Sequence, residues 1–224
     1  MVNKILLIVL SLIFFYPGFK TIAQKKSLQV FDFVESKENS LPDYFQEGIT
    51  GVWKKTQWLV KNINGNKVLA HIGFWEDDPD GVFPVCWIKD GKARDFTLSV
   101  KLYPVHPPVE IKHAVHDGAG IIFRFKNTNN YYLLRSVPLE KRVRLYKVVN
   151  GKRKLLSGKN LEIELDKWHE LKIKIIGQNF TAYFNGEELF KFADSTFSEA
   201  GAFGLWCKPN NVTYFDDLSA EIIN

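Results

Sequence analysis

Arginines and tyrosines at alternating positions in two neighbouring segments are the residues most suited to chemistry. Tyr131 and Arg135 alternate with apolar residues in the first segment, and Arg144 and Tyr146 do so in the second. Alternate residues of a strand share one face, so paired segments would gather all four side chains on one surface. Phenol rings stack on the apolar faces of sugars, and guanidinium forks bind hydroxyl pairs or carboxylates. The pattern predicts a carbohydrate-binding sheet face, and a ladder of ion pairs with glutamates would explain it equally well.

Two more residues extend this candidate site. Arg124 precedes the two segments in a third predicted strand, and Trp206 lies in a later one. The complete set of predicted ligand-binding residues is Arg124, Tyr131, Arg135, Arg144, Tyr146 and Trp206. Lys152, Arg153 and Lys154 form the densest basic cluster, and its position at a turn predicts a solvated tip.

Histidines are concentrated in a second stretch. His106, His113 and His116 lie close together and are followed by Asp117. Histidine is a common metal ligand, but this spacing matches no standard zinc site, so we expect a loop rather than a metal centre. The sequence has no Ser-His-Asp motif, phosphate loop, dinucleotide fingerprint or CxxC pair.

The elements that must position these residues are strands. From Phe96 onward apolar and polar residues alternate, as in strands with one buried face. The segments expected to form strands are 96–102, 121–125, 131–137, 143–149, 161–165, 171–175, 180–184, 203–207 and 214–223. No window of a dozen residues carries a helical period. The recurrence of short strands predicts an all-β fold of two antiparallel sheets.

Turn signals separate the predicted strands. Asn150-Gly151 and Asn185-Gly186 each sit between alternating segments, and Asn64-Gly65 and Asp90-Gly91 are further candidates. Such pairs tolerate the positive φ of a tight two-residue hairpin. The least regular stretch, Gly73 to Gly91, is predicted to be a long loop.

The N-terminal segment indicates export. Lys4 precedes an apolar run from Ile5 to Tyr16, and Thr21-Ile22-Ala23 offers a small residue for cleavage. Residues 1–23 are therefore predicted to be a signal peptide, too short for a comfortable membrane span, and residues 24–224 a single domain. We expect a secreted or periplasmic protein that is free of the membrane after cleavage.

Charge and cysteine content restrict the partners. The net charge falls from +5 to +3 when the signal peptide is removed, which is too mild for nucleic-acid binding. We expect a monomer.

Cys86 and Cys207 lie in apolar strand-like surroundings in an exported chain, so a disulfide and two buried free thiols are both consistent with the sequence.

The segment from Gly118 to Leu218 resembles a known superfamily. Its motifs are Ala119 to Arg124, Asn129 to Arg135, Val143 to Lys147, Trp168 to Ile173, Phe184-Asn185-Gly186, Gly204-Leu205-Trp206 and Thr213 to Leu218. It resembles the concanavalin A-like lectin/glucanase superfamily, in its laminin-G-like branch, and is similar to exported proteins near the 3-keto-disaccharide hydrolase family. The resemblance implies a jelly-roll sandwich and a carbohydrate partner.

The resemblance also implies two sites that involve acids. Retaining glycosidases of this superfamily use acids spaced by two on one strand, and Glu162, Glu164 and Asp166 have that spacing, although alternation alone explains it. Sandwiches of this kind often hold a structural Ca²⁺ between the first and last strands, where Asp32 and Asp217 would be its ligands. An ion pair with a lysine is the alternative there. No other cofactor is expected.

Three functions are consistent with these features. The first is a glycan-recognition domain that uses the arginine–aromatic face. The second is a hydrolase or lyase of disaccharides or 3-keto-glycosides, with acids from the segment 76–80 or from His113, His116 and Asp117. The third is a structural or adhesive surface domain.

Overall fold

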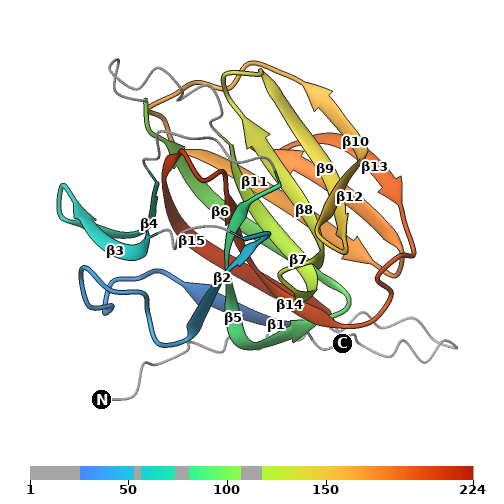
Figure 1. Ribbon diagram of the computed structural model, residues 1–224, viewed down its shortest axis with the longest axis horizontal. Coiled ribbons are helices and arrows are strands. Elements are labelled where there is room, and N and C mark those ends of the chain that lie inside the picture. Colours follow the sequence, from blue (N-terminus) through green and yellow to red (C-terminus); the bar gives the residue numbers. More distant parts are fainter. Residues whose placement is uncertain (1–25, 53–56, 74–80, 107–117, 224) are drawn as a thin grey trace, which may run out of the picture.

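The computed structural model describes residues 26–52, 57–73, 81–106 and 118–223. In these ranges every regular element is a strand, and the strands form two antiparallel sheets (Figure 1). The predicted all-β class is therefore confirmed. Within the same ranges, no helix long and apolar enough to cross a membrane is found.

The first sheet contains eight strands. Their bounds are β1 (Lys26–Phe31), β3 (Gln57–Ile63), β4 (Asn66–Ile72), β6 (Phe96–Pro104), β11 (His169–Ile176), β12 (Asn179–Phe184), β13 (Glu187–Ala193) and β15 (Val212–Ile223). Their order is β13-β12-β11-β6-β15-β4-β3, and β1 pairs with the C-terminal half of β15. The first and last strands are thus neighbours, as predicted, with Phe31 opposite Leu218.

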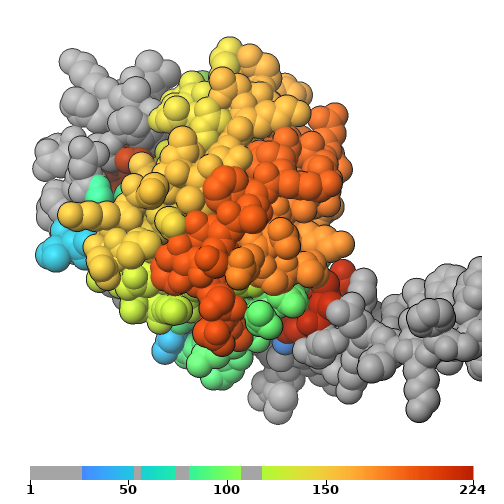
Figure 2. Space-filling model, turned by 90° about the vertical axis from the view of Figure 1, so that its right-hand side faces the viewer, coloured from blue at the N-terminus to red at the C-terminus, as the bar shows by residue number. Residues whose placement is uncertain are grey.

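The second sheet contains seven strands. Their bounds are β2 (Phe45–Thr50), β5 (Phe83–Ala93), β7 (Ala119–Asn127), β8 (Asn130–Val137), β9 (Arg142–Val149), β10 (Lys152–Asn160) and β14 (Gly201–Cys207). Their order is β10-β9-β8-β7-β14-β5-β2. The edge strands β10 and β13 of the two sheets contact each other, and side chains close this side of the sandwich (Figure 2).

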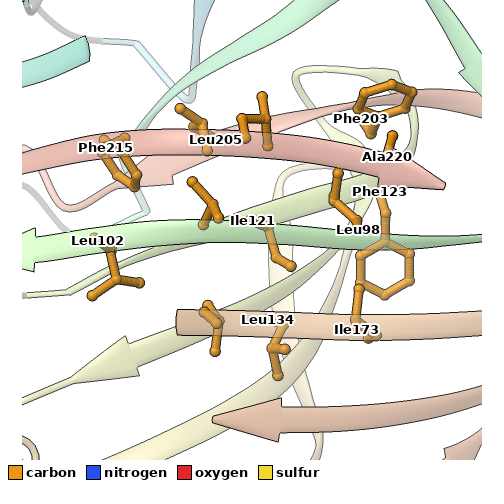
Figure 3. Close-up of a cluster of buried hydrophobic side chains, with 14 of the residues drawn as sticks. Leu98, Leu102, Ile121, Phe123, Leu134, Ile173, Phe203, Leu205, Phe215 and Ala220 are labelled. Carbon is orange, nitrogen blue, oxygen red and sulfur yellow. The ribbon is translucent and has the colours of Figure 1, made fainter. Parts of the chain in front are cut away.

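The main core fills the space between the sheets. Alternate residues of the strands supply it, among them Leu98 and Leu102 from β6, Ile121 and Phe123 from β7, and Phe215 from β15 (Figure 3). Each of these side chains is fully buried. Burial of a large aliphatic or aromatic side chain contributes about 1.5–3 kcal/mol, so this layer is the main stabilising feature of the fold.

Three of the four predicted hairpin turns are confirmed. Asn64-Gly65, Asn150-Gly151 and Asn185-Gly186 join consecutive strands, and all six residues have positive φ. The fourth prediction is wrong, because Asp90 and Gly91 lie inside β5. A Cβ at Gly91 would stand 2.8 Å from Ile88 Cγ2, so this glycine permits close packing within a bent strand rather than a turn.

The predicted strand at 161–165 is a connecting segment between β10 and β11. Its side chains do alternate, with Ile163 buried and Glu162 and Glu164 exposed. Two backbone contacts hold it: Leu161 N donates to Lys141 O, and His169 Nε2 donates to Glu164 O. The alternation therefore reflects packing against the sandwich, not pairing with a neighbouring strand.

Candidate functional site

Except for Arg124, the predicted arginine–aromatic residues lie on the face of the second sheet that points away from the main core. Strands β8 and β9 are adjacent, and Arg135 is opposite Arg144 while Leu133 is opposite Tyr146. Next to Arg135 lies Gly120 on β7, and next to Gly120 lies Trp206 on β14. Because Gly120 has no side chain, Arg135 reaches across it, and its guanidinium lies 5.4 Å from the Trp206 ring centroid.

Tyr146 stands at the centre of this group. The guanidinium of Arg135 lies 5.1 Å from the Tyr146 ring centroid, and that of Arg153 on β10 lies 4.8 Å from it. Arg135 Nη2 also donates to the Tyr146 hydroxyl at 3.4 Å. Cation–π contacts of this kind each contribute on the order of 0.5–2 kcal/mol, and they fix the two arginines around the phenol ring.

The electrostatics of this group are dominated by positive charge. Burial alone would raise the pKa of Tyr146, but the charges of Arg135, Arg153 and Arg142 together lower it below its ordinary value of 10. Burial and the repulsion of Arg135 lower the pKa of Arg153 to about 10. Both pKa values are shifted in the direction expected in a region of positive electrostatic potential.

The second sheet is curled around this face. Arg153 on β10 lies over the ring of Phe83 on β5, with 4.7 Å to the centroid, although four strands separate them in the sheet. Tyr131 Oη on β8 lies 2.8 Å from Thr50 Oγ1 on β2. In Figure 1, β2 runs across the direction of β7 and β8. These contacts between distant strands show that the sheet is strongly curled, and we call the inner side of this curl the trough.

The bottom of the trough is filled by a second apolar cluster. Its members are Phe83, Val85, Ile122, Phe125, Tyr131, Leu133, Tyr146, Val148, Ala202 and Trp206, with Trp87 packed against them. Tyr131 and Trp206 are fully buried, and Arg135 is 3% exposed. The prediction of an open face is therefore wrong for these three residues, which build the floor. Arg144 and Arg153 are half-buried and Tyr146 is 9% exposed, so the accessible groups lie along β9 and β10.

Arg124 does not join the other predicted residues. A β-bulge interrupts β7, and Arg124 has a φ of 47°, so Phe125 takes its place on the trough side. The Arg124 guanidinium is buried at the end of the sandwich, where it donates to the carbonyls of Phe197, Arg94 and Gly177. Its role is to satisfy three backbone acceptors, which strict alternation did not predict.

Arg153 is the residue that the sequence interpretation missed. It was predicted to be part of a solvated tip, but it pairs with Val148 across the Asn150-Gly151 hairpin, so it shares the face of Tyr146. The hairpin register contained this information. Once the two-residue turn is accepted, alternation along β10 places Arg153 on the trough side and Lys152 and Lys154 on the other.

The other predicted acids are engaged in ion pairs or, at Asp32, in a backbone hydrogen bond. Asp217 Oδ2 lies 2.7 Å from Lys101 Nζ, and Asp32 Oδ1 accepts from Val34 N at 3.3 Å. Glu162 pairs with Lys141 at 3.0 Å and Glu164 with Lys167 at 2.5 Å. In the described part of the chain, no group of three or more histidines, cysteines or acids has a geometry that could hold a metal ion.

The segment 76–80, His113, His116 and Asp117 lie outside the described residues. His106 is exposed, and its backbone N–H donates to Asp166 Oδ1 at 2.9 Å.

Cys86 and Cys207 are buried free thiols. They lie on the neighbouring strands β5 and β14, and Leu205 is opposite Cys86. Burial raises the pKa of both thiols well above their ordinary value. Of the two states consistent with the sequence, the structure has the unbridged one.

Comparison with known proteins adds a sequence match and several structural ones. Residues 113–222, slightly less than half of the chain, are similar to the family described as "Galactocerebrosidase, C-terminal lectin domain". No curated protein matches the chain in sequence.

Two solved structures share the fold at low identity. The carbohydrate-binding module CBM66 from Bacillus subtilis aligns with a TM-score of 0.61 and 19% identity, covering 75% of this chain and 94% of that one. "Cellulose induced protein, Cip1" also has a TM-score of 0.61, with 10% identity and 85% and 95% coverage.

A third solved structure is domain 4 of the arabinanase AbnA from Geobacillus stearothermophilus, in complex with arabinotriose. It aligns with a TM-score of 0.52 and 14% identity, covering 87% of this chain and 91% of that one. The fold is thus a jelly-roll sandwich of the lectin/glucanase type, as the resemblance implied.

Proposed function

We propose that this protein is an exported carbohydrate-recognition domain that binds a glycan along β9 and β10. The observation that carries the proposal is the match of residues 113–222 to a lectin domain. That segment contains both strands and every arginine around Tyr146. CBM66 and domain 4 of AbnA, which share the fold, support the same class of function, since the first is a carbohydrate-binding module and the second is in complex with arabinotriose.

The accessible side chains suit a sugar. Arg144 and Arg153 present planar donors, and the Tyr146 ring lies 4.8 Å from the Arg153 guanidinium. Buried Arg135 lies between Tyr146 and Trp206 within contact distance of both rings and supports Tyr146 from below. A rigid floor under a few accessible polar groups lowers the entropy lost on binding, which is the usual route to affinity in small glycan sites.

The remaining features of the proposal come from the sequence. The apolar segment at 5–16 favours export to a secreted or periplasmic location, with a signal peptide at residues 1–23. We further propose a monomer without nucleic-acid or membrane partners, within the laminin-G-like branch near the 3-keto-disaccharide hydrolase family. A Ca²⁺ ion at Asp32 and Asp217 would require the Lys101 ion pair to open.

A binding screen tests the function. The exported protein is applied to immobilised plant, algal and bacterial polysaccharides, and retained sugars are followed by isothermal titration calorimetry. We expect saturable binding to at least one polysaccharide and a weaker interaction for Arg144→Ala. Failure to bind any member of a broad panel would refute the proposal, and full affinity in Arg144→Ala would refute the location.

A further inference from the structure

The structure assigns a ligand class to this site: we propose that β9 and β10 bind an acidic sugar, through a uronate carboxylate or a sulfate group. This inference rests on the proposed function, because it specifies the sugar that the same surface would take. It is carried by the arrangement of the arginines around Tyr146, of which two, Arg144 and Arg153, have no acidic partner in the part of the chain that the structure describes.

Two of the arginines on β9 and β10 are not paired with an acid of the described residues. Arg142 forms an ion pair with Glu140. Arg144 and Arg153, by contrast, form no ion pair with any residue in the described ranges. After burial, the groups that act most strongly on Arg153 are the cations Arg135 and Arg142 and the phenols of Tyr146 and Tyr131, and no carboxylate of the described residues is among them. Like charges gathered on a partly buried surface repel one another, so a bound anion would relieve this repulsion.

Arg144 is held ready for such a ligand. Gly158 lies opposite it on β10, and a Cβ there would stand 2.3 Å from Arg144 Cδ, so the arginine lies flat over the glycine. Its Nη1 donates to Val143 O at 3.1 Å and its Nη2 to Asn160 Oδ1 at 2.5 Å. A guanidinium carries five N–H donors, so donors on Nε, Nη1 and Nη2 stay available for a carboxylate or sulfate.

Arg153 provides the second charge. Its guanidinium is sandwiched between the rings of Phe83 and Tyr146, at 4.7 and 4.8 Å from their centroids. Its Nη1 is buried and has no hydrogen-bond partner among the described residues. A desolvated donor without an acceptor is costly, and an anionic oxygen is the acceptor that suits it best. A neutral hydroxyl would satisfy the hydrogen bond but leave the charge uncompensated.

The test compares acidic with matched neutral polymers. Polygalacturonate and its carboxyl-reduced form differ in the carboxylates, and dextran sulfate and dextran differ in the sulfates. Affinities of the exported protein are measured by calorimetry at low and moderate salt. We expect tighter binding to one or both acidic polymers than to their neutral partners, by about tenfold or more, with a loss of affinity as salt rises.

Matched variants locate the effect. Arg144→Gln and Arg153→Gln are each expected to weaken acidic binding by about tenfold or more, because each removes a charge-assisted contact. Lys159→Gln removes the same charge from an exposed position on the same strand and is expected to change affinity by less than about twofold. Arg144→Lys keeps the positive charge but lacks the planar, paired donors of the guanidinium. It therefore separates the effect of donor geometry on affinity from the effect of net charge. Thermal unfolding confirms that each variant is folded.

The outcomes distinguish the two proposals. Binding to neutral polymers that is equal to or tighter than binding to the acidic ones would overturn this inference and leave the glycan-recognition function in place. Binding to no polymer at all would overturn both. Acidic binding that Lys159→Gln weakens as much as Arg144→Gln would indicate unspecific attraction and would also overturn the inference. If Arg153→Gln fails to fold, Arg144→Gln and Arg144→Lys still decide the question.

Discussion

His71 should make the stability of this protein depend on pH in a way that can be isolated. The side chain is fully buried on β4 beside Trp58, and burial lowers its pKa from 6.5 to about 4. Its Nδ1 lies 3.0 Å from Asn211 O, a carbonyl that can only accept, so the neutral ring carries its proton on Nδ1. Nε2 is buried and has no hydrogen-bond partner in the described ranges, so protonation there would add an uncompensated charge.

The sign and size of the effect follow from the two pKa values. The folded state resists protonation, whereas the unfolded chain takes up the proton as pH falls below 6.5. The contribution of His71 is therefore fully present above pH 6.5 and is lost as pH falls through 4. Linkage gives a loss of about 2 kcal/mol by pH 5 and about 3 kcal/mol by pH 4.

The assay is the free energy of unfolding in urea, followed by tryptophan fluorescence between pH 7.5 and 4. Asn is the matched substitution, because its amide N–H₂ can replace Nδ1 as donor to Asn211 O and does not titrate. We expect His71→Asn to be less stable at pH 7.5 and the difference from wild type to shrink by about 2 kcal/mol at pH 5. A difference that stays constant over this range would refute the assignment of a buried neutral imidazole.

Three further predictions concern groups outside the trough. Arg124→Met should destabilise the protein by about 3–5 kcal/mol in chemical denaturation, because the carbonyls of Phe197, Arg94 and Gly177 lose a common donor; a loss below about 1 kcal/mol would contradict this role. Asp194 accepts from Tyr132 Oη and Lys147 Nζ, and these contacts, with those from Thr196, lower its pKa despite burial. Asp194→Asn should therefore cost about 1–2 kcal/mol at pH 7, and the difference should narrow below about pH 4, where the unfolded carboxylate is protonated; a gap that persists at pH 2.5 would count against it. Finally, Cys86 and Cys207 should not react with a thiol reagent in the folded protein, and both should react in denaturant. Absence of reaction in denaturant would indicate a disulfide.

Much of the fold follows from the alternation of side chains, because a half-buried strand imposes it directly. The register of β8 and β9, which brings Arg135 opposite Arg144, agrees with the arrangement assumed from sequence. The same rule was wrong at Leu161–Leu165, where alternating burial comes from a segment packed against the sandwich. Alternation therefore indicates which face of a chain is buried and does not guarantee a pairing partner.

The candidate site was harder to predict for two physical reasons. A β-bulge with a positive φ at Arg124 turns this side chain away from the face that strict alternation predicts. No local pattern in the sequence indicates the bulge. The curling of the second sheet brings β10 over β5, so that Tyr131 and Trp206 become a floor rather than a contact surface. Both effects depend on tertiary packing, which a strand-by-strand interpretation does not include.

The edge strand β10 has a further consequence for the behaviour of the protein in concentrated solution. Lys152, Lys154 and Lys159 are exposed along it, and its pairing with β9 shifts register between Leu155 and Ser157. Exposed lysines and an irregular edge both disfavour the addition of a strand from another molecule. The same strand that offers Arg153 to a ligand is thus protected against self-association into extended β-aggregates.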